Sequence, residues 1–409
     1  MAYFYRDREL RLGNADASVR VADVAYRSGR PTYVYDLDDV EMRFRKYRDS
    51  FAGMTHTIHY AMKANSNPKI LAMLARVGAG VDTVSAGEIK LAVQAGIPAD
   101  RIIFSGVAKT ERELEYAIGL GIKQVNVESP SELRRIAKIS RRLGRVTDVA
   151  FRMNPDVDAK THPYITTGFR ENKFGMDESF VPELLETLKT NEASLRLRGL
   201  TMHIGSLLFD LAVLRQALEK ICAVHRSLAS RGFQLDRIDV GGGLGIRYET
   251  DDATEELAIL AAYGKMVRET LTAELGDLSG IEVLTEPGRM IVARSGLLVS
   301  EVQYVKRAPA KTFLIVDTGM HHLLRPALYQ AKHRVLPLKV SDQPRHSYDV
   351  VGPICESSDV LAKNVELSEV HEGELIALAD AGAYGFAMAN TYNAHELPDE
   401  VVVAGNRVV

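Results

Sequence analysis

Short apolar runs alternate with amphipathic stretches of helical spacing from residue 56 to about residue 290. Each run has the length of a strand and is followed by a credible helix or a loop. The runs are THTIHYAM (55–62), AGVDTVS (79–85), RIIFSG (101–106), QVNVES (124–129), DVAFRMN (148–154), the weaker YITTGFRENKFGM (164–176), LRGLTMHIGS (197–206) and RIDVGGG (237–243). Eight such units in about 230 residues predict a (β/α)8 barrel, the TIM-barrel fold.

The pattern changes after residue 290, where β-branched alternation replaces helical spacing. Runs such as GLLVSEVQYVKRAPAKTFLIVDTG and VVVAGNRVV indicate strands, and RPTYVYDLD indicates one more strand ahead of the barrel. We therefore expect an α/β chain with two domains. The barrel takes residues 34–285, and a mainly β domain, a β-barrel or sandwich, takes residues 1–33 and 286–409.

Composition narrows the class of protein. A chain of 409 residues is long enough for two domains, and 51 basic and 54 acidic residues give a net charge of only −3. This balance favours a small-molecule enzyme and gives no reason to expect a nucleic-acid or membrane partner, or a bound metal. Two cysteines, Cys222 and Cys355, suit a reducing compartment. Because the first residues lack an apolar signal-peptide core and no run approaches ~20 apolar residues, we expect a cytoplasmic protein.

Polar residues collect at the predicted strand ends, where a (β/α)8 barrel places its active site. Lys63 ends the first run in HYAMKANSN, and an isolated lysine at a strand end is usually a solvated surface residue. The other strand ends offer further polar residues, although a strand end is also where a chain returns to solvent. They are Asp82, Ser105, Glu128, Arg152 with Asn154, Lys173, and His203 with Ser206.

Three adjacent glycines, Gly241, Gly242 and Gly243, indicate either tight packing or a backbone cradle for phosphate. The G-x-G-x-x-G fingerprint of dinucleotide-binding folds is absent. HIGS and DVGGG are expected to end strands seven and eight, which commonly bind phosphate in barrels. Pyridoxal 5′-phosphate offers a phosphate, an aldehyde for Lys63 and a ring for His203, and Glu286 is a candidate partner for its protonated ring nitrogen.

A series of motifs resembles the fold-type III pyridoxal-phosphate-dependent decarboxylases, and NPDVDAKTHPYITTG resembles their diaminopimelate branch more than the ornithine or arginine branches. The series spans nearly the whole chain in the family's order. It comprises YAMKANSNPKIL, FSGVAKTERELEYA, NVESPSEL, RMNPDVDAKTHPYITTG, NKFGM, HIGS, DVGGGLGIRY, EPGRMIV, RPALY, VGPICESSDVLAK and DAGAYGFAMANTYN. The resemblance implies a carboxy-lyase that converts meso-2,6-diaminopimelate to L-lysine and CO2, the last step of lysine biosynthesis, through a Schiff base and a quinonoid of the cofactor.

The resemblance assigns roles to individual residues. The catalytic set comprises Lys63 as the Schiff-base lysine, His203 stacked on the ring, Glu286 at the ring nitrogen and Cys355 as the proton donor. Cofactor binding is assigned to Lys63, Asp82, Arg152, His203, Ser206, Gly241, Gly242, Gly243, Glu286, Gly288, Arg289 and Tyr384. Substrate binding is assigned to Arg289, Arg325, Tyr329, Glu356 and Tyr384. In the family, the equivalents of Cys355 and Glu356 enter the neighbouring subunit's site, so the resemblance implies a homodimer with shared active sites.

Some positions depart from the family's pattern at the distal end of the substrate. They are Leu207, the pair His321 and His322, and the run Ala394, His395 and Glu396. The alternative is a related pyridoxal-phosphate decarboxylase that acts on another amino acid or on a carrier-bound glutamyl group. A non-catalytic protein of this fold is disfavoured because Lys63 and Cys355 are both present, and an alanine racemase because the CESSD and EPGR motifs occur together.

Overall fold

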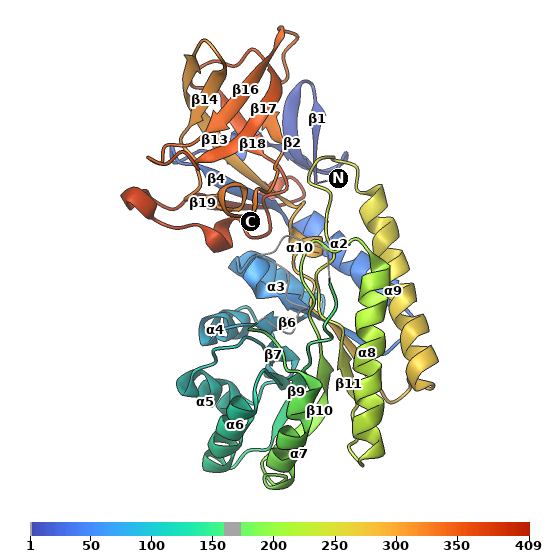
Figure 1. Ribbon diagram of the computed structural model, residues 1–409. Helices are drawn as coiled ribbons and strands as arrows, with labels where there is room; N and C mark the ends of the chain where they lie inside the picture. The colour runs from blue at the N-terminus through green and yellow to red at the C-terminus, as the bar shows by residue number, and fades with distance from the viewer. Residues whose placement is uncertain (1, 159–172) are drawn as a thin grey trace. The chain divides into compact units, whose positions relative to one another are not determined.

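The computed structural model describes residues 2–158 and 173–409, which form two compact units. The first unit comprises residues 1–44, 246–255 and 289–409, and the second comprises residues 45–245 and 256–288 (Figure 1). These bounds differ from those expected from the sequence, at residues 33/34 and 285/286. Residues 34–44 lie with the first unit because strand β4 (Thr32–Asp36) pairs with strands of its sheet. Residues 246–255 also lie there, and Arg294 donates hydrogen bonds to the carbonyl oxygens of Arg247 and Thr250.

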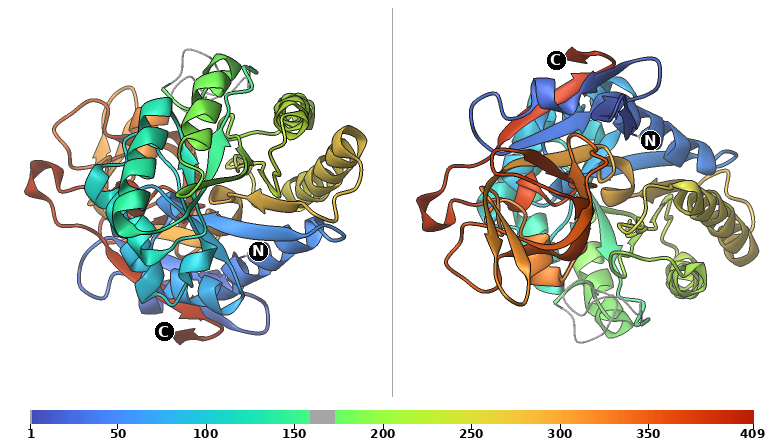
Figure 2. Two further views of the ribbon diagram at one scale, coloured as in Figure 1. Left: turned by 90° about the horizontal axis from the view of Figure 1, so that it is seen from below. Right: turned by 90° about the horizontal axis from the view of Figure 1, so that it is seen from above.

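The second unit is a closed barrel of eight strands, all parallel to their neighbours. Figure 2 (left) shows helices around this ring of strands. The strands are β5 (His56–Ala61), β6 (Gly80–Thr83), β7 (Ile102–Phe104), β8 (Gln124–Val127), β9 (Thr147–Arg152), β10 (Leu195–Thr201), β11 (Arg237–Asp239) and β12 (Glu282–Thr285). The helices are α3 (Pro68–Arg76), α4 (Ala86–Gln94), α5 (Glu111–Leu120), α6 (Pro130–Leu143), α7 (Val181–Lys189), α8 (Leu211–Ser230) and α9 (Thr254–Leu275). The (β/α)8 barrel expected from the sequence is therefore confirmed.

One of the eight predicted strands was wrong. β9 pairs directly with β10 from Leu195↔Thr147 to Thr201↔Arg152, so the barrel has no place for a strand at 164–176 between them. Residues 164–172 of that run lie outside the described residues, and Met176 makes only an isolated bridge to Met153. The eighth strand is β12, which closes the ring between β11 and β5. HIGS and DVGGG therefore follow strands six and seven, and Glu286 follows strand eight.

The first unit is mainly β-sheet, as predicted. A nine-stranded sheet among the described residues has the order β17-β16-β14-β13-β4-β19-β20, and β18 and β15 attach to β13. Its strands beyond β4 are β13 (Gly296–Arg307), β14 (Thr312–Val316), β15 (Val335–Pro337), β16 (Arg345–Val351), β17 (Val360–Ser368), β18 (Leu375–Leu378), β19 (Asp399–Ala404) and β20 (Arg407–Val408). A smaller sheet holds β1 (Tyr3–Arg6), β2 (Glu9–Gly13) and β3 (Ser18–Arg20).

The core of the first unit joins the two sheets. Leu10 and Leu12 of β2 pack in one buried cluster with Val34 of β4 and with Leu297 and Val299 of β13. Four helices are assigned to the rest of the described chain: α1 (Val21–Val24), α2 (Leu37–Ser50), α10 (Arg289–Val292) and α11 (Arg325–Tyr329). The short helices α10 and α11 each begin at an arginine that is almost fully buried.

Candidate active site

Lys63 is fixed at the end of β5 by a tight turn. The chain passes from β5 into a single 3-10 turn, Met62–Ala64, and then into α3. Asn65 accepts the Asn67 N–H through its side chain at 2.9 Å, and Asn67 caps α3 by accepting the Lys69 N–H at 3.0 Å. Pro68 follows at the first helical position, where no N–H is needed. The motif KANSNP therefore ends a strand, presents one lysine and starts a helix within six residues.

The Lys63 ammonium lies beside a buried carboxylate. Its Nζ is 3.3 Å from Asp82 Oδ2, and the Lys63 side chain is 37% exposed whereas the Asp82 side chain is fully buried. Burial raises the pKa of Asp239, on β11, to about 7. Burial, with the charges of Asp239 and Asp82, also raises the pKa of Glu286 well above its usual range, while Lys63 and Arg152 act in the opposite direction. Three buried acids, Asp82, Asp239 and Glu286, thus share the positive charges of Lys63 and Arg152.

Two oxygens of these acids lack a hydrogen-bond partner among the described residues. They are Asp82 Oδ1 and Asp239 Oδ2, whereas Asp239 Oδ1 accepts the Gly241 N–H at 2.9 Å. Unsatisfied buried acceptors are rare because they cost free energy. These two oxygens mark a buried polar place that a bound polar group could complete, which is one reason that the site suits pyridoxal phosphate.

The three glycines approach neighbouring backbone too closely for any side chain. A Cβ would overlap the carbonyl oxygen of Met202 at Gly241, that of Glu286 at Gly242 and that of Gly205 at Gly243. Gly241 and Gly243 have φ values of +69° and +109°, which favour glycine. The triplet therefore packs bare backbone tightly between HIGS and EPGR, and the N–H groups of Gly241 and Gly242 are donated to Asp239 and His203.

His203 follows β10 and faces the glycines. Its Nδ1 accepts a hydrogen bond from the Gly242 N–H at 3.4 Å. Burial, with the charges of Lys63 and Arg152, lowers the pKa of His203 well below its usual range. The ring is therefore neutral at pH 7 and suited to stack on an aromatic ring. Ser206 lies in the loop after β10, which is tied to the glycines because the Leu208 N–H donates to the Gly243 carbonyl at 2.9 Å.

Two buried arginines of the first unit converge on one tyrosine. Arg289 Nη1 donates to Tyr248 Oη at 2.7 Å, and the Arg325 guanidinium lies 4.6 Å from the centre of the same ring. The Arg289 guanidinium also lies 4.9 Å from the Tyr384 ring centre. Both guanidinium groups are held against aromatic rings, and a planar guanidinium can donate two parallel hydrogen bonds, so both suit the carboxylates of a substrate.

The Arg325 guanidinium is oriented by a hydrogen bond to His333, a residue that the sequence analysis did not identify. Arg325 Nη1 lies 2.8 Å from His333 Nε2, and His333 Nδ1 lies 2.8 Å from the Ala379 carbonyl oxygen. Because a carbonyl can only accept, Nδ1 carries the proton and Nε2 accepts from Arg325. Burial, with the charge of Arg325, lowers the pKa of His333 to about 3, so the ring stays neutral. His333 lies outside the motifs, and Tyr248 ends the motif DVGGGLGIRY without a role of its own, so the sequence analysis predicted neither contact.

The GPICESSD loop is folded around Asp359. Its carboxylate accepts the N–H groups of Ile354 at 2.7 Å and Met320 at 2.6 Å. This arrangement leaves Cys355 exposed. The Glu356 carboxylate accepts hydrogen bonds from the hydroxyl of Tyr392 and, at 3.2 Å, from that of Ser358.

The rings of His321, His322 and His395, at the positions that depart from the family's pattern, form one cluster in which neighbouring rings are tilted. The ring centres of His321 and His322 are 3.6 Å apart, and those of His321 and His395 are 4.6 Å apart. His322 is fixed by Thr318 Oγ1 at 3.0 Å and by the Glu396 carbonyl oxygen at 2.8 Å. Burial lowers the pKa of His321 to about 3.

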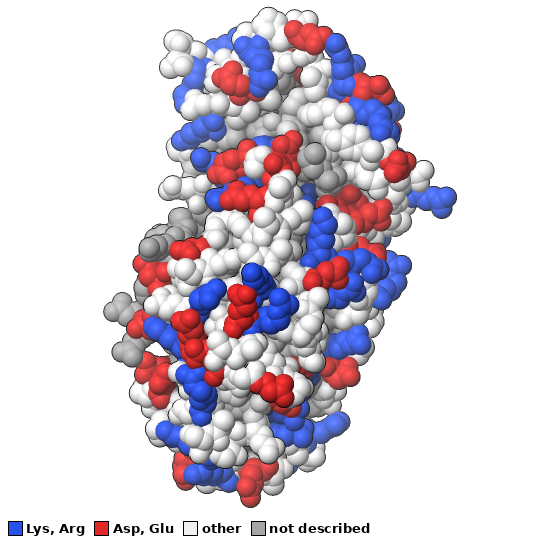
Figure 3. Space-filling view, turned by 90° about the vertical axis from the view of Figure 1, so that its right-hand side faces the viewer, with Lys and Arg blue, Asp and Glu red and all other residues white. Residues whose placement is uncertain are grey.

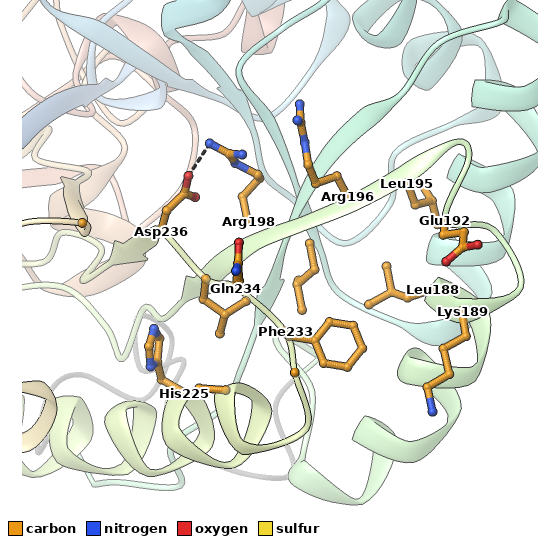
Figure 4. Close-up of a pocket in the computed structure, with 15 residues that line it drawn as sticks. Leu188, Lys189, Glu192, Leu195, Arg196, Arg198, His225, Phe233, Gln234 and Asp236 are labelled. Carbon is orange, nitrogen blue, oxygen red and sulfur yellow. Dashed lines mark ion pairs between the residues drawn. The ribbon is translucent and has the colours of Figure 1, made fainter.

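One further pocket lies in the barrel unit, away from the residues described above. A pocket of about 990 Å³ lies around the N-terminal end of β10, whereas Lys63 and His203 follow the C-terminal ends of their strands. An ion pair between Arg198 and Asp236 lies in this pocket (Figure 4). Lysine, arginine and acidic side chains are intermixed on the face shown in Figure 3. Within the described residues no helix is long and apolar enough to cross a membrane, and no cluster of three or more His, Cys, Asp or Glu could hold a metal.

Comparison with known proteins places these features in a class. Residues 37–293 match the family model of the pyridoxal-dependent decarboxylases, pyridoxal binding domain. The chain is 41% identical over 404 residues to the diaminopimelate decarboxylase of Aquifex aeolicus, covering 99% of this chain and 93% of that protein. It is 42% identical over 407 residues to that of Pseudomonas aeruginosa, covering 99% and 94%.

Solved structures agree. The diaminopimelate decarboxylase of Helicobacter pylori complexed with L-lysine has a TM-score of 0.86 at 41% identity, covering 92% of this chain and 93% of that chain. That of M. jannaschii in co-complex with L-lysine has a TM-score of 0.90 at 32% identity, covering 100% and 94%. The fold and site thus define a pyridoxal-phosphate-dependent decarboxylase, as predicted. Within this class, the chain belongs to the diaminopimelate decarboxylase family.

Proposed function

We propose that this chain removes one carboxylate of meso-2,6-diaminopimelate as CO2 and releases L-lysine. The observation that carries the proposal is the group at the barrel's strand ends, in which Lys63 lies 3.3 Å from Asp82 beside the buried acids Asp239 and Glu286. A lysine beside buried acids and a glycine cradle suits pyridoxal phosphate. When bound, this cofactor supplies a sink for the electron pair left on the α-carbon when CO2 leaves.

The barrel residues would hold the cofactor. Lys63 supplies the amine for its aldehyde, Glu286 a carboxylate for its ring nitrogen, and His203 a neutral ring for stacking. The phosphate is assigned to Ser206, to Gly241, Gly242 and Gly243, and to the backbone of 286–289 including Gly288, with Tyr384 closing that side. Asp82 and Arg152 set the charge around the cofactor. We propose that the barrel unit, residues 45–245 and 256–288, binds the cofactor and that the mainly β unit supplies substrate-binding and catalytic residues.

The substrate's carboxylates are assigned to Arg289 and Arg325, with Tyr329. The hydrogen bond between Arg325 and His333 fixes the direction of one guanidinium. Arginine suits this task because its planar group can donate two parallel hydrogen bonds to a carboxylate. Glu356 is the acceptor for the distal ammonium, and the hydroxyls of Tyr392 and Ser358 hold its carboxylate in one orientation.

Cys355 is assigned the final proton transfer. Its Sγ would deliver a proton to the α-carbon after the bond to CO2 has broken. The exposed position of Cys355 on a well-ordered loop suits a residue that serves another chain's site. The working unit is accordingly a homodimer in which Cys355 and Glu356 complete the partner's active site. The proposed biosynthetic role of this protein and its two free cysteines support a cytoplasmic location.

A substrate panel tests the function. The purified protein is incubated with meso-diaminopimelate, lysine, ornithine, arginine and glutamate, and both CO2 and the product amine are measured. We expect CO2 and L-lysine from meso-diaminopimelate alone. Equal or faster turnover of another amino acid would contradict the proposal.

A further inference from the structure

Glu128, one of the polar residues at the strand ends, has no role in the proposed function. It follows β8, and its carboxylate is buried. Oε1 accepts a hydrogen bond from Arg152 Nη1 at 2.7 Å, and Oε2 accepts the Gly175 N–H at 2.8 Å. The side chains of Glu128 and Arg152 are 2% and 11% exposed. Both carboxylate oxygens are therefore used, and they tie the ends of β8 and β9 to Gly175.

The backbone that carries Glu128 is itself fixed. The Glu128 N–H donates to Glu132 Oε2 at 2.7 Å, and the other oxygen of Glu132 accepts from Lys109 Nζ at 2.8 Å. Lys109 is buried and also donates to the carbonyl oxygens of Gly106 at 2.7 Å and Asn126 at 2.6 Å. The Glu128 carboxylate thus starts from a rigid base, as a residue that orients another side chain requires.

Arg152 is the side chain that Glu128 orients. Its guanidinium also lies 4.9 Å from the centre of the Phe174 ring. Its charge opposes the rise that burial causes in the pKa values of Asp239 and Glu286, and adds to the fall that burial causes in that of His203. Asp82 Oδ1 and Asp239 Oδ2 have no hydrogen-bond partner among the described residues, so an unrestrained Arg152 would find acceptors there.

We propose that Glu128 is a positioning residue for the decarboxylation. Its carboxylate keeps the Arg152 guanidinium paired at the ends of β8 and β9, and so prevents Arg152 from pairing with the acids that face Lys63 and the cofactor. The inference rests on the proposed function, in which Arg152, Asp82 and Glu286 belong to the cofactor site. Glu128→Gln, which keeps one oxygen as an acceptor for the Gly175 N–H, should therefore act through Arg152.

A double-mutant cycle tests this coupling in the holoenzyme. The variants are Glu128→Gln, Arg152→Met and the double variant, with Glu183→Gln as a control because Glu183 is an exposed acid of α7. The measurements are kcat, KM and the concentration of pyridoxal phosphate that half-saturates the resolved apoprotein, read from visible absorbance. We expect Glu128→Gln to lower kcat by roughly 10- to 10²-fold and to weaken cofactor binding, with KM changed by less than about 3-fold. The double variant should be no worse than Arg152→Met.

Each alternative outcome is decisive. The inference is overturned if the effects of the two single substitutions multiply in the double variant. It is also overturned if Glu128→Gln behaves like the Glu183→Gln control. If Glu128→Gln does not fold, Glu128→Asp, which keeps the charge but shortens its reach, enters the same cycle. Failure of the proposed function is distinguishable, since it would appear as wild-type protein inactive on meso-diaminopimelate or as Arg152→Met with normal cofactor binding.

Discussion

At the scale of single residues, Lys63 is placed by a capped turn and faces an acid that is fully buried. If it holds the cofactor's aldehyde, the purified protein should be yellow, and borohydride reduction followed by peptide mapping should recover the pyridoxyl group on Lys63. The Lys63→Ala protein should be inactive, whereas Lys69→Ala, in the adjacent helix, should retain the label and the activity. A pyridoxyl group on any other lysine would show that the assignment is wrong.

In the proposed function Glu286 faces the protonated ring nitrogen, whose positive charge would favour the ionised form of this buried carboxyl. Glu286→Gln keeps the volume but removes the charge, so kcat should fall by about 10²-fold or more while the cofactor stays bound. Steady-state kinetics together with the cofactor content after dialysis measure both effects. The exposed Glu111→Gln change serves as the control, and normal turnover in Glu286→Gln would refute the role.

Arg325 should make the distal carboxylate a requirement. Lysine lacks this group and would leave a buried guanidinium unpaired, so its kcat/KM should be lower than that of meso-diaminopimelate by about 10³-fold or more. In Arg325→Met this penalty disappears, and the ratio of the two kcat/KM values should shrink. Comparable values for both amino acids with the wild-type protein would contradict the assignment.

The sequence showed the residues in motifs but not those that orient them. Lys63, His203 and Glu286 stand at strand ends, where chain periodicity alone marks them as candidates. Tyr248 and Asp239 stand in the motif DVGGGLGIRY without a role of their own, His333 stands outside the motifs, and each gains its role from a hydrogen bond in the folded chain. Their side chains have no local pattern, because a single tyrosine or histidine in a loop is chemically unremarkable until packing supplies a neighbour.

At the scale of elements, β5 carries two histidines whose charge the barrel suppresses. Burial lowers the pKa of His56 to about 4 and that of His59, where the charge of Lys123 acts in the same direction, to about 3. Both ring nitrogens of His59 lack a hydrogen-bond partner among the described residues. Below pH 6.5 the unfolded chain binds protons that the folded barrel does not, so stability falls as the pH drops towards these values.

Replacing His59 should therefore reduce the acid sensitivity. The free energy of unfolding, measured in urea at pH 7 and pH 5, should fall less in His59→Leu than in the wild type, by about 2 kcal/mol. The exposed His346→Leu change controls for loss of a histidine as such. An unchanged pH dependence in His59→Leu would mean that His59 is not neutral in the folded state.

The eighth strand of the barrel was predicted wrongly, and the reason also lies at the scale of elements. EVLT (282–285) is only four residues long and follows the long helix α9 and a turn, so its periodicity is too short to distinguish from a helix end. The run 164–176 holds isoleucine, threonine and aromatic residues that favour a strand locally. Direct pairing of β9 with β10 leaves no position between them for a barrel strand, a constraint that a local preference cannot reveal.

At the scale of the whole molecule, the proposed homodimer makes a quantitative prediction. If Cys355 acts in the partner's site while Lys63 stays in its own barrel, inactive Lys63→Ala and Cys355→Ala chains should complement each other when mixed. Random pairing restores at most about a quarter of wild-type activity, because only mixed dimers hold one intact site. Subunit exchange is verified with differently tagged chains, and exchange without recovered activity would place both residues in one chain.

The pairing of β4 with β13 and β19 has a consequence for how the protein is made. The strand is among the first parts of the chain to leave the ribosome, but Arg30, just before it, meets Asp399 across 369 positions of sequence. At about 5–20 residues per second, roughly 20–70 s pass before this partner is synthesised. The barrel residues emerge meanwhile and can collapse first. Until β19 is synthesised, the buried, apolar strand β4 lacks its neighbour on that side. A nascent chain stalled before residue 399 should consequently be the form of this protein that most needs a chaperone.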